Sequence, residues 1–441
     1  FLGGAKRKKS QLYYQSENGH FYENTPEVIL KDSLFEDVDA VFADLENDGD
    51  LDLVVASGGN EYWDKHEALK QRAYINDGNG NFQVNEDLFP GAFLTASCVL
   101  PADFNGDGLV DFFFGGRAVP WNYGVTPESY LFVNTGNGRF EDHTEDYAPG
   151  LRDVGLVKNG CWEDIDRDGD KDLLLAMEWG PVQIFLNNGG KLDKRPLNDM
   201  TGWWNFVLPY DFDGDGDMDI LAGNLGANSK LQPTREEPVR MYVNDFDENG
   251  QVEQVLTYYL EGKEIPFANY KELTTQMVSL KKKYLFAKDF ARATLPEIFG
   301  EEALAGATVR EVNTLKSMYF ENTGEGLTFK PHPLPDELQF SAMKAASLYD
   351  FDSDGKVDVL IGGNFYENNI EMGRYDANFG NVLSIGDDGA FRVQPLGSLR
   401  VKGQVRRIKP VRIGGRLCFI IARNDDSVMV VRPSSADKDM L

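Results

Sequence analysis

The sequence predicts an all-β protein, a seven-bladed β-propeller of four-stranded antiparallel blades with a helical insertion around residues 268–305. Three observations predict this fold. A nine-residue acidic loop recurs six times, a short apolar run follows most of the copies, and a glycine-rich hairpin recurs between them. Together they make a unit of about 45–60 residues, within or slightly above the usual length of a propeller blade. The 441 residues, 41% of them hydrophobic, suffice for a large core.

The acidic loop follows the pattern Asp-x-[Asp/Asn/Glu]-x-[Asp/Asn]-Gly-x-x-[Asp/Glu]. Oxygen atoms at alternate positions of a short loop suit Ca²⁺, which takes about six to eight oxygen ligands. Position 6 is glycine in every copy, because the chain must turn sharply there and glycine reaches a positive φ at little cost. Position 7 varies freely, as expected if only its main-chain carbonyl binds. The loops therefore predict up to six structural calcium ions.

The candidate metal ligands, at positions 1, 3, 5, 7 and 9 of each loop, are Asp44, Glu46, Asp48, Asp50 and Asp52; Asp103, Asn105, Asp107, Leu109 and Asp111; Asp164, Asp166, Asp168, Asp170 and Asp172; Asp211, Asp213, Asp215, Asp217 and Asp219; Asp245, Asp247, Asn249, Gln251 and Glu253; and Asp350, Asp352, Asp354, Lys356 and Asp358. An EF-hand begins in the same way but needs a glutamate at position 12 and a following helix. Position 12 is apolar in all six loops, and short strand-like runs such as LDLVVA and VDVLIG follow instead. The EF-hand is excluded.

The hairpins indicate how the chain divides into blades. They read YINDGNGNF (residues 74–82), FVNTGNGRF (132–140), IFLNNGGKL (184–192) and FENTGEGLTF (320–329), with the glycines that tight hairpins need. The segment 11–21 matches the same hairpin, so we expect a first blade that is incomplete at residues 1–24. A last blade without a metal loop is expected at residues 403–433. The whole chain, 1–441, is interpreted as one seven-bladed propeller whose two ends must meet.

The fifth loop, at Asp245, departs from the repeat. The strand before it, VRMYVN, aligns with the outer hairpin of other units, so we place this loop at the periphery of the fifth blade. The following segment has apolar residues at helical spacing, Leu273, Met277, Leu280 and Tyr284. It predicts a helical insertion over residues 263–310 that either covers the edge of the propeller or docks a partner.

Composition narrows the class of partner and compartment. A formal net charge of −28 disfavours nucleic acids and anionic membranes as partners. Cys98, Cys161 and Cys418 lie far apart in apolar runs and are expected to be buried thiols. Calcium loops suit the calcium-rich space outside the cytosol. No signal peptide or membrane-spanning run is present, and because the chain starts with Phe1 we expect an upstream segment to have been removed or left out.

These loops, strands and hairpins resemble the FG-GAP/VCBS repeats of calcium-binding propellers, which also occur in integrin α-subunits and bacterial surface proteins. The resemblance spans roughly residues 1–432. It implies structural Ca²⁺ at the loops and binding through a propeller face, with Asp44, Glu46, Asp48 and Asp52 as ligands in the first loop. The segment NYKELTTQ and the run before it resemble large bacterial secreted or surface lipoproteins, which implies an extracellular, outer-membrane-associated protein.

No catalytic motif is present, and the four histidines show no partner pattern. The candidate ligand-binding residues follow the second strands of the blades and are Trp63, Trp121, Trp179, Asn224 and Tyr366. Aromatic rings with amides suit sugars or a protein interface, but such residues also serve in turns and blade packing. The first hypothesis is a non-catalytic, calcium-stabilised surface propeller that binds a protein partner. The alternative is a glycan-binding propeller or a lyase that cleaves polysaccharides.

Overall fold

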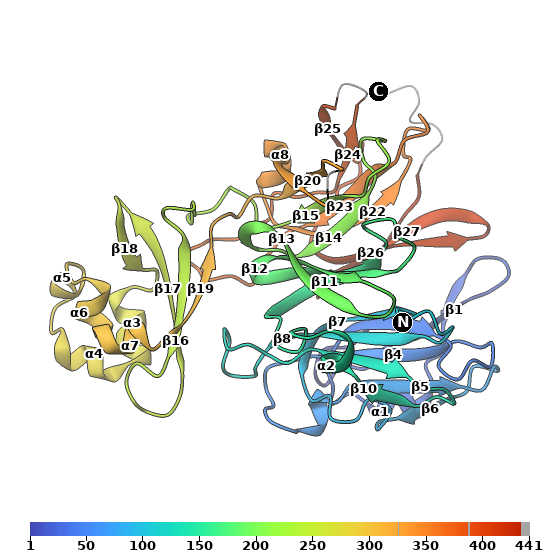
Figure 1. Cartoon of the computed structure of the whole chain (residues 1–441), viewed down its shortest axis with the longest axis horizontal. Coiled ribbons are helices and arrows are strands. Elements are labelled where there is room, and N and C mark those ends of the chain that lie inside the picture. Colours follow the sequence, from blue (N-terminus) through green and yellow to red (C-terminus); the bar gives the residue numbers. More distant parts are fainter. Residues whose placement is uncertain (325, 387–388, 434–441) are drawn as a thin grey trace.

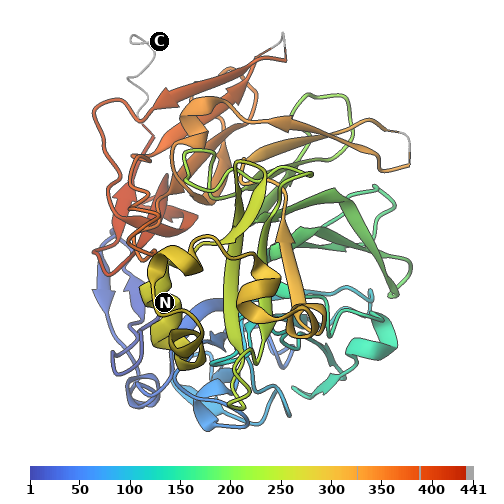
Figure 2. The ribbon, with the colours of Figure 1, turned by 90° about the vertical axis from the view of Figure 1, so that its left-hand side faces the viewer.

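The computed structural model describes residues 1–324, 326–386 and 389–433. Among them the strands form antiparallel sheets that succeed one another along the chain. Figure 2 shows these sheets arranged around the molecule in chain order, with an inserted segment in front of their centre. The fold is a β-propeller, as the sequence predicts.

Five sheets are regular blades in which the first two strands flank an acidic loop. They consist of β3 (Asp37–Ala43), β4 (Asp52–Ser57), β5 (Arg72–Asn76) and β6 (Phe82–Asn85); β7 (Thr95–Ala102), β8 (Asp111–Ala118), β9 (Tyr130–Asn134) and β10 (Phe140–Asp142); β11 (Leu156–Glu163), β12 (Asp172–Asn187) and β13 (Leu192–Trp203); β14 (Phe206–Tyr210), β15 (Asp219–Gly223), β20 (Met318–Asn322) and β21 (Phe329–Pro333); and β22 (Met343–Tyr349), β23 (Asp358–Gly363), β24 (Asn381–Ile385) and β25 (Phe391–Pro395). The short helices between strands are α1 (Glu27–Lys31), η1 (Glu67–Leu69), α2 (Thr144–Tyr147) and α8 (Asp336–Gln339).

The second strand of each blade supplies much of the core. Every residue of β4, β15 and β23 is buried, which explains why the sequence there is a continuous apolar run rather than an alternating one. Side chains of one blade pack against the next: Val54 and Ala56 share a cluster with Phe112 and Phe114. In the third blade β12 supplies both the second and the third strand. Its two ends lie side by side, since the N–H of Asn187 at its end donates to Asp172 at its start.

The ring closes where the two ends of the described chain meet. The last sheet contains β26 (Gln404–Ile413), β27 (Arg416–Asn424) and β28 (Met429–Val431), and the first hairpin contains β1 (Tyr13–Gln15) and β2 (Phe21–Glu23). Arg407 on β26 forms an ion pair with Asp39 on β3, 2.9 Å apart. A Cβ atom on Gly19, in the β1–β2 turn, would lie 3.0 Å from the nitrogen of Gly414.

Seven blades are not confirmed. In the described part of the chain, six sheets contribute a first strand to the ring: those led by β3, β7, β11, β14, β22 and β26. The β1–β2 hairpin has no such strand of its own: Tyr14 packs on the blade of β3–β6, and the hairpin turn reaches the last sheet at Gly414. The repeat pattern counted both chain ends as blades because each contains strand-like runs.

The Asp245 loop belongs to a separate sheet inserted between β15 and β20. This sheet has the order β18-β17-β16-β19, with β16 (Val239–Asn244), β17 (Glu253–Leu260), β18 (Lys263–Pro266) and β19 (Thr308–Val312). The placement of VRMYVN in the outer hairpin of a blade was therefore wrong: it is β16, a central strand of the inserted sheet, and the outer strands of that blade are β20 and β21. The two segments were confused because β16 and β20 both end in asparagine after an apolar run, β16 in Val-Asn and β20 in Glu-Asn.

The helices α3 (Tyr270–Gln276), α4 (Val278–Lys283), α5 (Ala287–Phe290), α6 (Leu295–Phe299) and α7 (Glu301–Ala305) pack on this sheet, within the predicted insertion. We call residues 239–312 the arm, and Figure 1 shows it projecting from the ring. Its base packs on the ring through Val239, Met241 and Trp179, and Arg310 donates to the carbonyl of Gly124 at 2.9 Å. None of the described helices is both long and apolar enough to cross a membrane.

Candidate functional site

The six acidic loops share one hydrogen-bond pattern. The N–H of the position 6 glycine donates to the position 1 aspartate at 2.7–3.2 Å in all six. The N–H of position 7 donates to Oδ1 of position 5 at 2.8–3.2 Å. These bonds fold each loop around its acidic side chains, so that position 1 is held by the turn that the glycine makes.

Position 9 is the buried acid of each loop, and it is also a scaffold. Asp172 is fully buried, and its two oxygens accept the N–H groups of Ile165 and Asn187, each at 2.8 Å. The same pair of bonds recurs at Asp52 and Asp219. The position 9 side chain thus ties the loop to the third strand of its blade.

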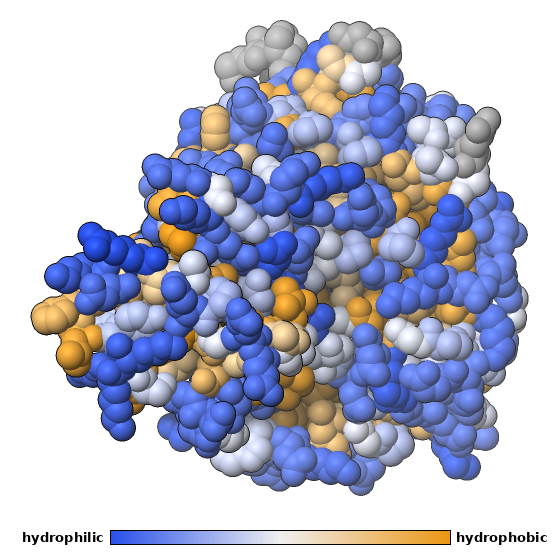
Figure 3. Space-filling view, turned by 60° about the vertical axis from the view of Figure 1, so that its left-hand side comes forward, coloured by the Kyte–Doolittle hydropathy of each residue, from blue (hydrophilic) through white to orange (hydrophobic). Residues whose placement is uncertain are grey.

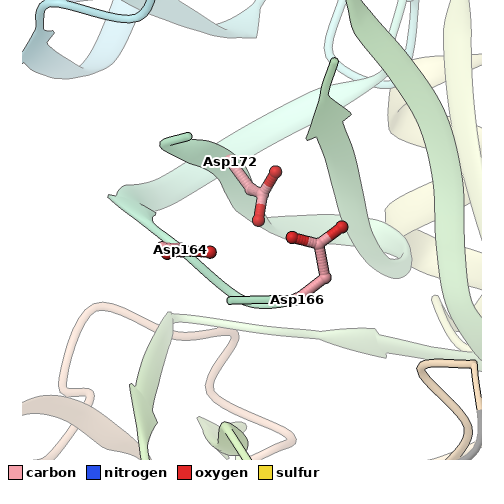
Figure 4. A group of neighbouring side chains, drawn as sticks. All are labelled: Asp164, Asp166 and Asp172. Carbon is pink, nitrogen blue, oxygen red and sulfur yellow. The ribbon is translucent and has the colours of Figure 1, made fainter. Parts of the chain in front are cut away.

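Three carboxylates converge in four of the loops. The ligand atoms of positions 1, 3 and 9 lie within 4.8 Å of one another in the groups Asp164, Asp166 and Asp172; Asp211, Asp213 and Asp219; Asp245, Asp247 and Glu253; and Asp350, Asp352 and Asp358. Figure 4 shows the first of these groups, with the carboxylates of Asp166 and Asp172 turned toward the space between the three residues. The fifth loop, irregular in sequence, is as compact as the others. In the first two loops position 3 is Glu46 or the amide Asn105.

The donor set fits a hard cation. Oδ1 of Asp164, Asp247 and Asp350 is buried and has no hydrogen-bond partner in the described residues, although buried carboxylate oxygens normally have one. All donors are oxygen atoms, which Ca²⁺ and Mg²⁺ prefer. These loops could therefore hold Ca²⁺ through positions 1, 3 and 9, and the position 5 and 7 ligands stay predictions.

Burial also raises the pKa of the carboxyl group at position 9. It raises the pKa of Asp172, Asp219 and Asp358 to about 6 and that of Asp111 to about 7, although backbone N–H donors act in the opposite direction. Neighbouring carboxylates of the same loop add to the rise. A bound cation would favour the ionised form and so reverse this effect.

Two structural features of the loops were missed in the sequence. Position 4 also has a positive φ, between 57° and 77°, at Asn47, Gly106, Arg167, Gly214, Glu248 and Ser353. The asparagine that ends the third strand links neighbouring blades, since Nδ2 of Asn134 donates to the carbonyl of Leu45 and Nδ2 of Asn187 to that of Phe104. The asparagine that recurs in the hairpin motif could have predicted this link between blades.

A second candidate site lies on the opposite face, where the first strands begin. In five blades the first strand contains a β-bulge, and the bulged residues are Val38, Ser97, Lys158, Lys344 and Arg406. Bulges re-aim side chains and are frequent next to functional sites. Lys158, Lys344 and Arg406 line a cavity of about 280 Å³ together with Asn205, which precedes β14.

The walls of this central cavity are charged and aromatic. Arg117 and Glu178 form an ion pair at 3.3 Å, and Trp203 and Phe365 supply aromatic surface. Burial alone would raise the pKa of Glu178, but Arg117 and the nearby lysines outweigh it and lower this pKa to about 2. Glu178 is therefore ionised throughout the physiological range.

The predicted ligand-binding residues divide into exposed and buried ones. Trp63 and Trp121 are 64% and 63% exposed and meet edge to face, with ring centres 5.7 Å apart. Tyr366 is half-buried beneath Arg374. Trp179 is buried against Trp203 and donates to the hydroxyl of Tyr123.

Asn224 is fully buried, and its amide bonds only main-chain groups, including those of Trp203 and Thr314. Trp179 and Asn224 therefore have the contacts of blade-packing residues. Trp203, Asn205, Lys158, Lys344 and Arg406 line the cavity but did not stand out in the sequence. Three of them could have been found from their place in the repeat, because Lys158, Asn205 and Lys344 each come six residues before the first aspartate of a loop.

Comparison with known proteins finds a repeat family that matches part of the chain and solved structures of low similarity. Residues 164–222 match the model of the FG-GAP-like repeat. No curated protein matched the chain. Similar solved structures include the Vibrio cholerae biofilm matrix protein Bap1, at 11% identity and a TM-score of 0.38, covering 90% of this chain and 77% of that one. A lectin of Agrocybe aegerita that recognises non-reducing terminal N-acetylglucosamine has 13% identity and a TM-score of 0.44, covering 98% and 90%. YCF48 of Cyanidioschyzon merolae has 10% identity and a TM-score of 0.40, covering 98% and 95%.

Proposed function

We propose that the protein is a non-catalytic, calcium-stabilised extracellular propeller that binds a protein partner within a cell-surface or outer-membrane assembly. The observation that carries the calcium part is the convergence of positions 1, 3 and 9 in four loops, with buried carboxylate oxygens that lack a partner in the described residues. Loops that hold metal in several blades would stabilise the ring at one face, while the central cavity and the base of the arm lie at the other.

The arm supports the choice of a protein as partner. Its tip exposes Leu285, Phe286 and Val278, which are 77%, 61% and 60% exposed. Figure 3 shows a small group of hydrophobic atoms at the outer end of the arm, with hydrophilic atoms beside it. The exposed lysines 281–283 and Lys288 lie close to them in the chain, and Nζ of Lys288 lies 5.5 Å from the centre of the Phe286 ring. A partner with an apolar spot bordered by acidic residues would complement this tip.

A glycan is the second candidate ligand, and the central cavity favours it. An ion pair, two aromatic side chains and an amide converge there, the combination that holds sugar rings and hydroxyl groups. Trp63 and Trp121 lie on the loops of the same face. Cleavage of a polysaccharide would turn this candidate into the lyase alternative.

A paired binding experiment tests these proposals. The calcium-loaded protein is applied to a glycan array and, in parallel, used for crosslinking capture from the surface of cells that produce it. We expect capture of a protein that is lost in Leu285→Ser/Phe286→Ser and kept in Trp63→Ala/Trp121→Ala. Retention of a glycan with loss only in the tryptophan variant, or release of glycan fragments, would overturn the protein-partner proposal. Unchanged thermal stability after calcium removal would overturn the calcium part.

A further inference from the structure

The bulged residues of the first strands give the central cavity an excess of positive charge. Four consecutive blades place Lys158, Asn205, Lys344 and Arg406 around it, and Arg117 adds a further cation. Two carboxylates, those of Glu178 and Glu367, face the four cations. The surplus is notable because the chain as a whole has a formal net charge of −28.

Neither carboxylate forms an ion pair with either lysine in the described residues, although Glu178 attracts both from a greater distance. Glu178 is engaged by Arg117 at 3.3 Å, and Glu367 accepts from the amide of Asn424 at 3.0 Å. Lys344 donates to Oδ1 of Asn205 at 2.8 Å and lies 4.8 Å from the centre of the Phe365 ring. Lys158 has neither a hydrogen bond nor an ion pair within the described ranges.

An ammonium group buried in a cavity without a direct ion pair is costly, and the cost shows as a lowered pKa. Burial, with Arg117 next in size, lowers the pKa of Lys158 well below its ordinary value, although Glu178 acts in the opposite direction. Burial lowers the pKa of Lys344 to about 7; Glu178 opposes this shift, and Arg406 and Arg117 add to it. An anion that entered the cavity would relieve both effects.

The remaining walls select the kind of anion. A phosphate or sulfate dianion would face the carboxylates of Glu178 and Glu367, and the fork of Arg117 is already occupied. A single carboxylate carries half that charge and is repelled less, and the hydroxyl groups beside it are neutral. Hydroxyls can donate to Glu367 and accept from Nε1 of Trp203, which is buried and has no acceptor in the described residues. The volume of about 280 Å³ lies just below the range of about 300–1,000 Å³ for drug-sized ligands, so it suits one ring.

We propose that the central cavity binds a single sugar acid, with its carboxylate between Lys158 and Lys344 and its ring against Trp203 and Phe365. This proposal rests on the second candidate function, glycan binding, and narrows it to acidic sugars. The ligand is either a free sugar acid or the terminal residue of an acidic glycan. The ring hydroxyls donate a hydrogen bond to Glu367 and accept one from Nε1 of Trp203.

Calorimetric titration of the calcium-loaded full chain tests the proposal with three probes: sodium glucuronate, glucose and inorganic phosphate. We expect glucuronate to bind at least tenfold more tightly than the other two, and Lys158→Met to weaken it at least tenfold. Lys194→Met, at an exposed position on β13, is the matched control and should bind as the wild type does. Because Lys158→Met removes a buried amine whose Nζ has no hydrogen bond or ion pair in the described residues, its melting temperature should equal or exceed that of the wild type, which separates lost binding from lost folding.

Three outcomes would overturn the sugar-acid site. Phosphate binding as tight as glucuronate would mean an unspecific anion site, and glucose binding as tight would mean that the lysines play no part. Absence of glucuronate binding to protein that melts as a calcium-loaded fold would also refute it. Retention of a neutral glycan through Trp63 and Trp121 in that case would leave glycan binding itself intact. An oligosaccharide ending in glucuronate, bound more tightly than the free acid, would identify the glycan terminus as the source.

Discussion

The acidic loops and the central cavity lie at opposite ends of the same first strands. In the third blade Lys158 is near the start of β11 and Asp164 follows its end. Each loop is complete within nine residues, and its geometry recurs from blade to blade. The cavity is built from residues of several blades at the axis of the ring, so its lining does not recur from blade to blade. Local chemistry thus repeats with the fold, whereas chemistry at the axis can change by substitution of one bulged residue in each blade.

The largest effect should come from removing metal. If the loops hold calcium only in the folded state, each site adds about 2.7 kcal/mol when free calcium is a hundred times its Kd. Excess EGTA should therefore lower the melting temperature by many degrees, and calcium should restore it. Calorimetry with and without EGTA measures this, and glucuronate affinity of any protein that stays folded should change little. An unchanged melting temperature would mean that the loops hold no stabilising calcium, and the ring would then have no metal-binding face to contrast with the face of the cavity.

The same contrast explains what the sequence could predict. The loops and the buried second strands were predictable because nine residues specify the turn and its ligands, and runs such as that of β4 are apolar throughout. Lys158 and Lys344 were not, because their common position matters only once the bulges turn them toward the axis. The count of seven blades is not confirmed for a related reason: it depends on how the ring closes, and Arg407 and Asp39, which pair there, lie far apart in the chain.

The next largest effect should separate the two roles of an acidic loop. Asp172→Ala removes a candidate ligand and also leaves the N–H groups of Ile165 and Asn187 buried without acceptors, which costs about 1–3 kcal/mol each. Asp166→Ala removes a candidate ligand and the acceptor of one exposed bond, from the N–H of Asp168 at 3.3 Å, which water can replace. In EGTA we expect Asp172→Ala to be clearly less stable to urea than the wild type and Asp166→Ala to be equal or slightly more stable. In calcium both should lose one bound ion by calorimetry. Equal destabilisation of the two variants in EGTA would refute the scaffold role of position 9.

A smaller effect should appear in the pH dependence of the cavity. Because the pKa of Lys344 is lowered to about 7 in the free protein, it is protonated below pH 7 and neutral above. A bound carboxylate raises that pKa, so binding above pH 7 takes up a proton and weakens by up to about tenfold per pH unit. Lys158 contributes in the same direction, whereas Glu178 stays ionised. The other charged groups that face Lys344 are Arg117, Arg406 and Glu367.

Titration of glucuronate at pH 6, 7, 8 and 9 measures this dependence. In Lys344→Met the affinity should be lower at pH 6 and the slope above pH 7 shallower than in the wild type. Affinity that is independent of pH in the wild type would mean that the lysines do not bind the carboxylate.

The smallest effect should be confined to the arm, where an acidic loop lies outside the ring. The Asp245 loop joins β16 to β17, and the helices depend on that hairpin: Asn244 donates to the carbonyl of Ala303 at 2.7 Å, and Phe246 packs on Phe299 with ring centres 5.1 Å apart. In calcium, Asp245→Asn/Asp247→Asn should speed amide hydrogen exchange in residues 239–312 by about tenfold or more, since the arm would lose one bound ion. The matched variant Asp211→Asn/Asp213→Asn should instead speed exchange in β14 and β15. If the arm variant lowered the temperature of the main melting transition as much as the blade variant does, the arm would unfold together with the ring. The Asp245 loop would then stabilise the whole protein, as the loops of the blades do.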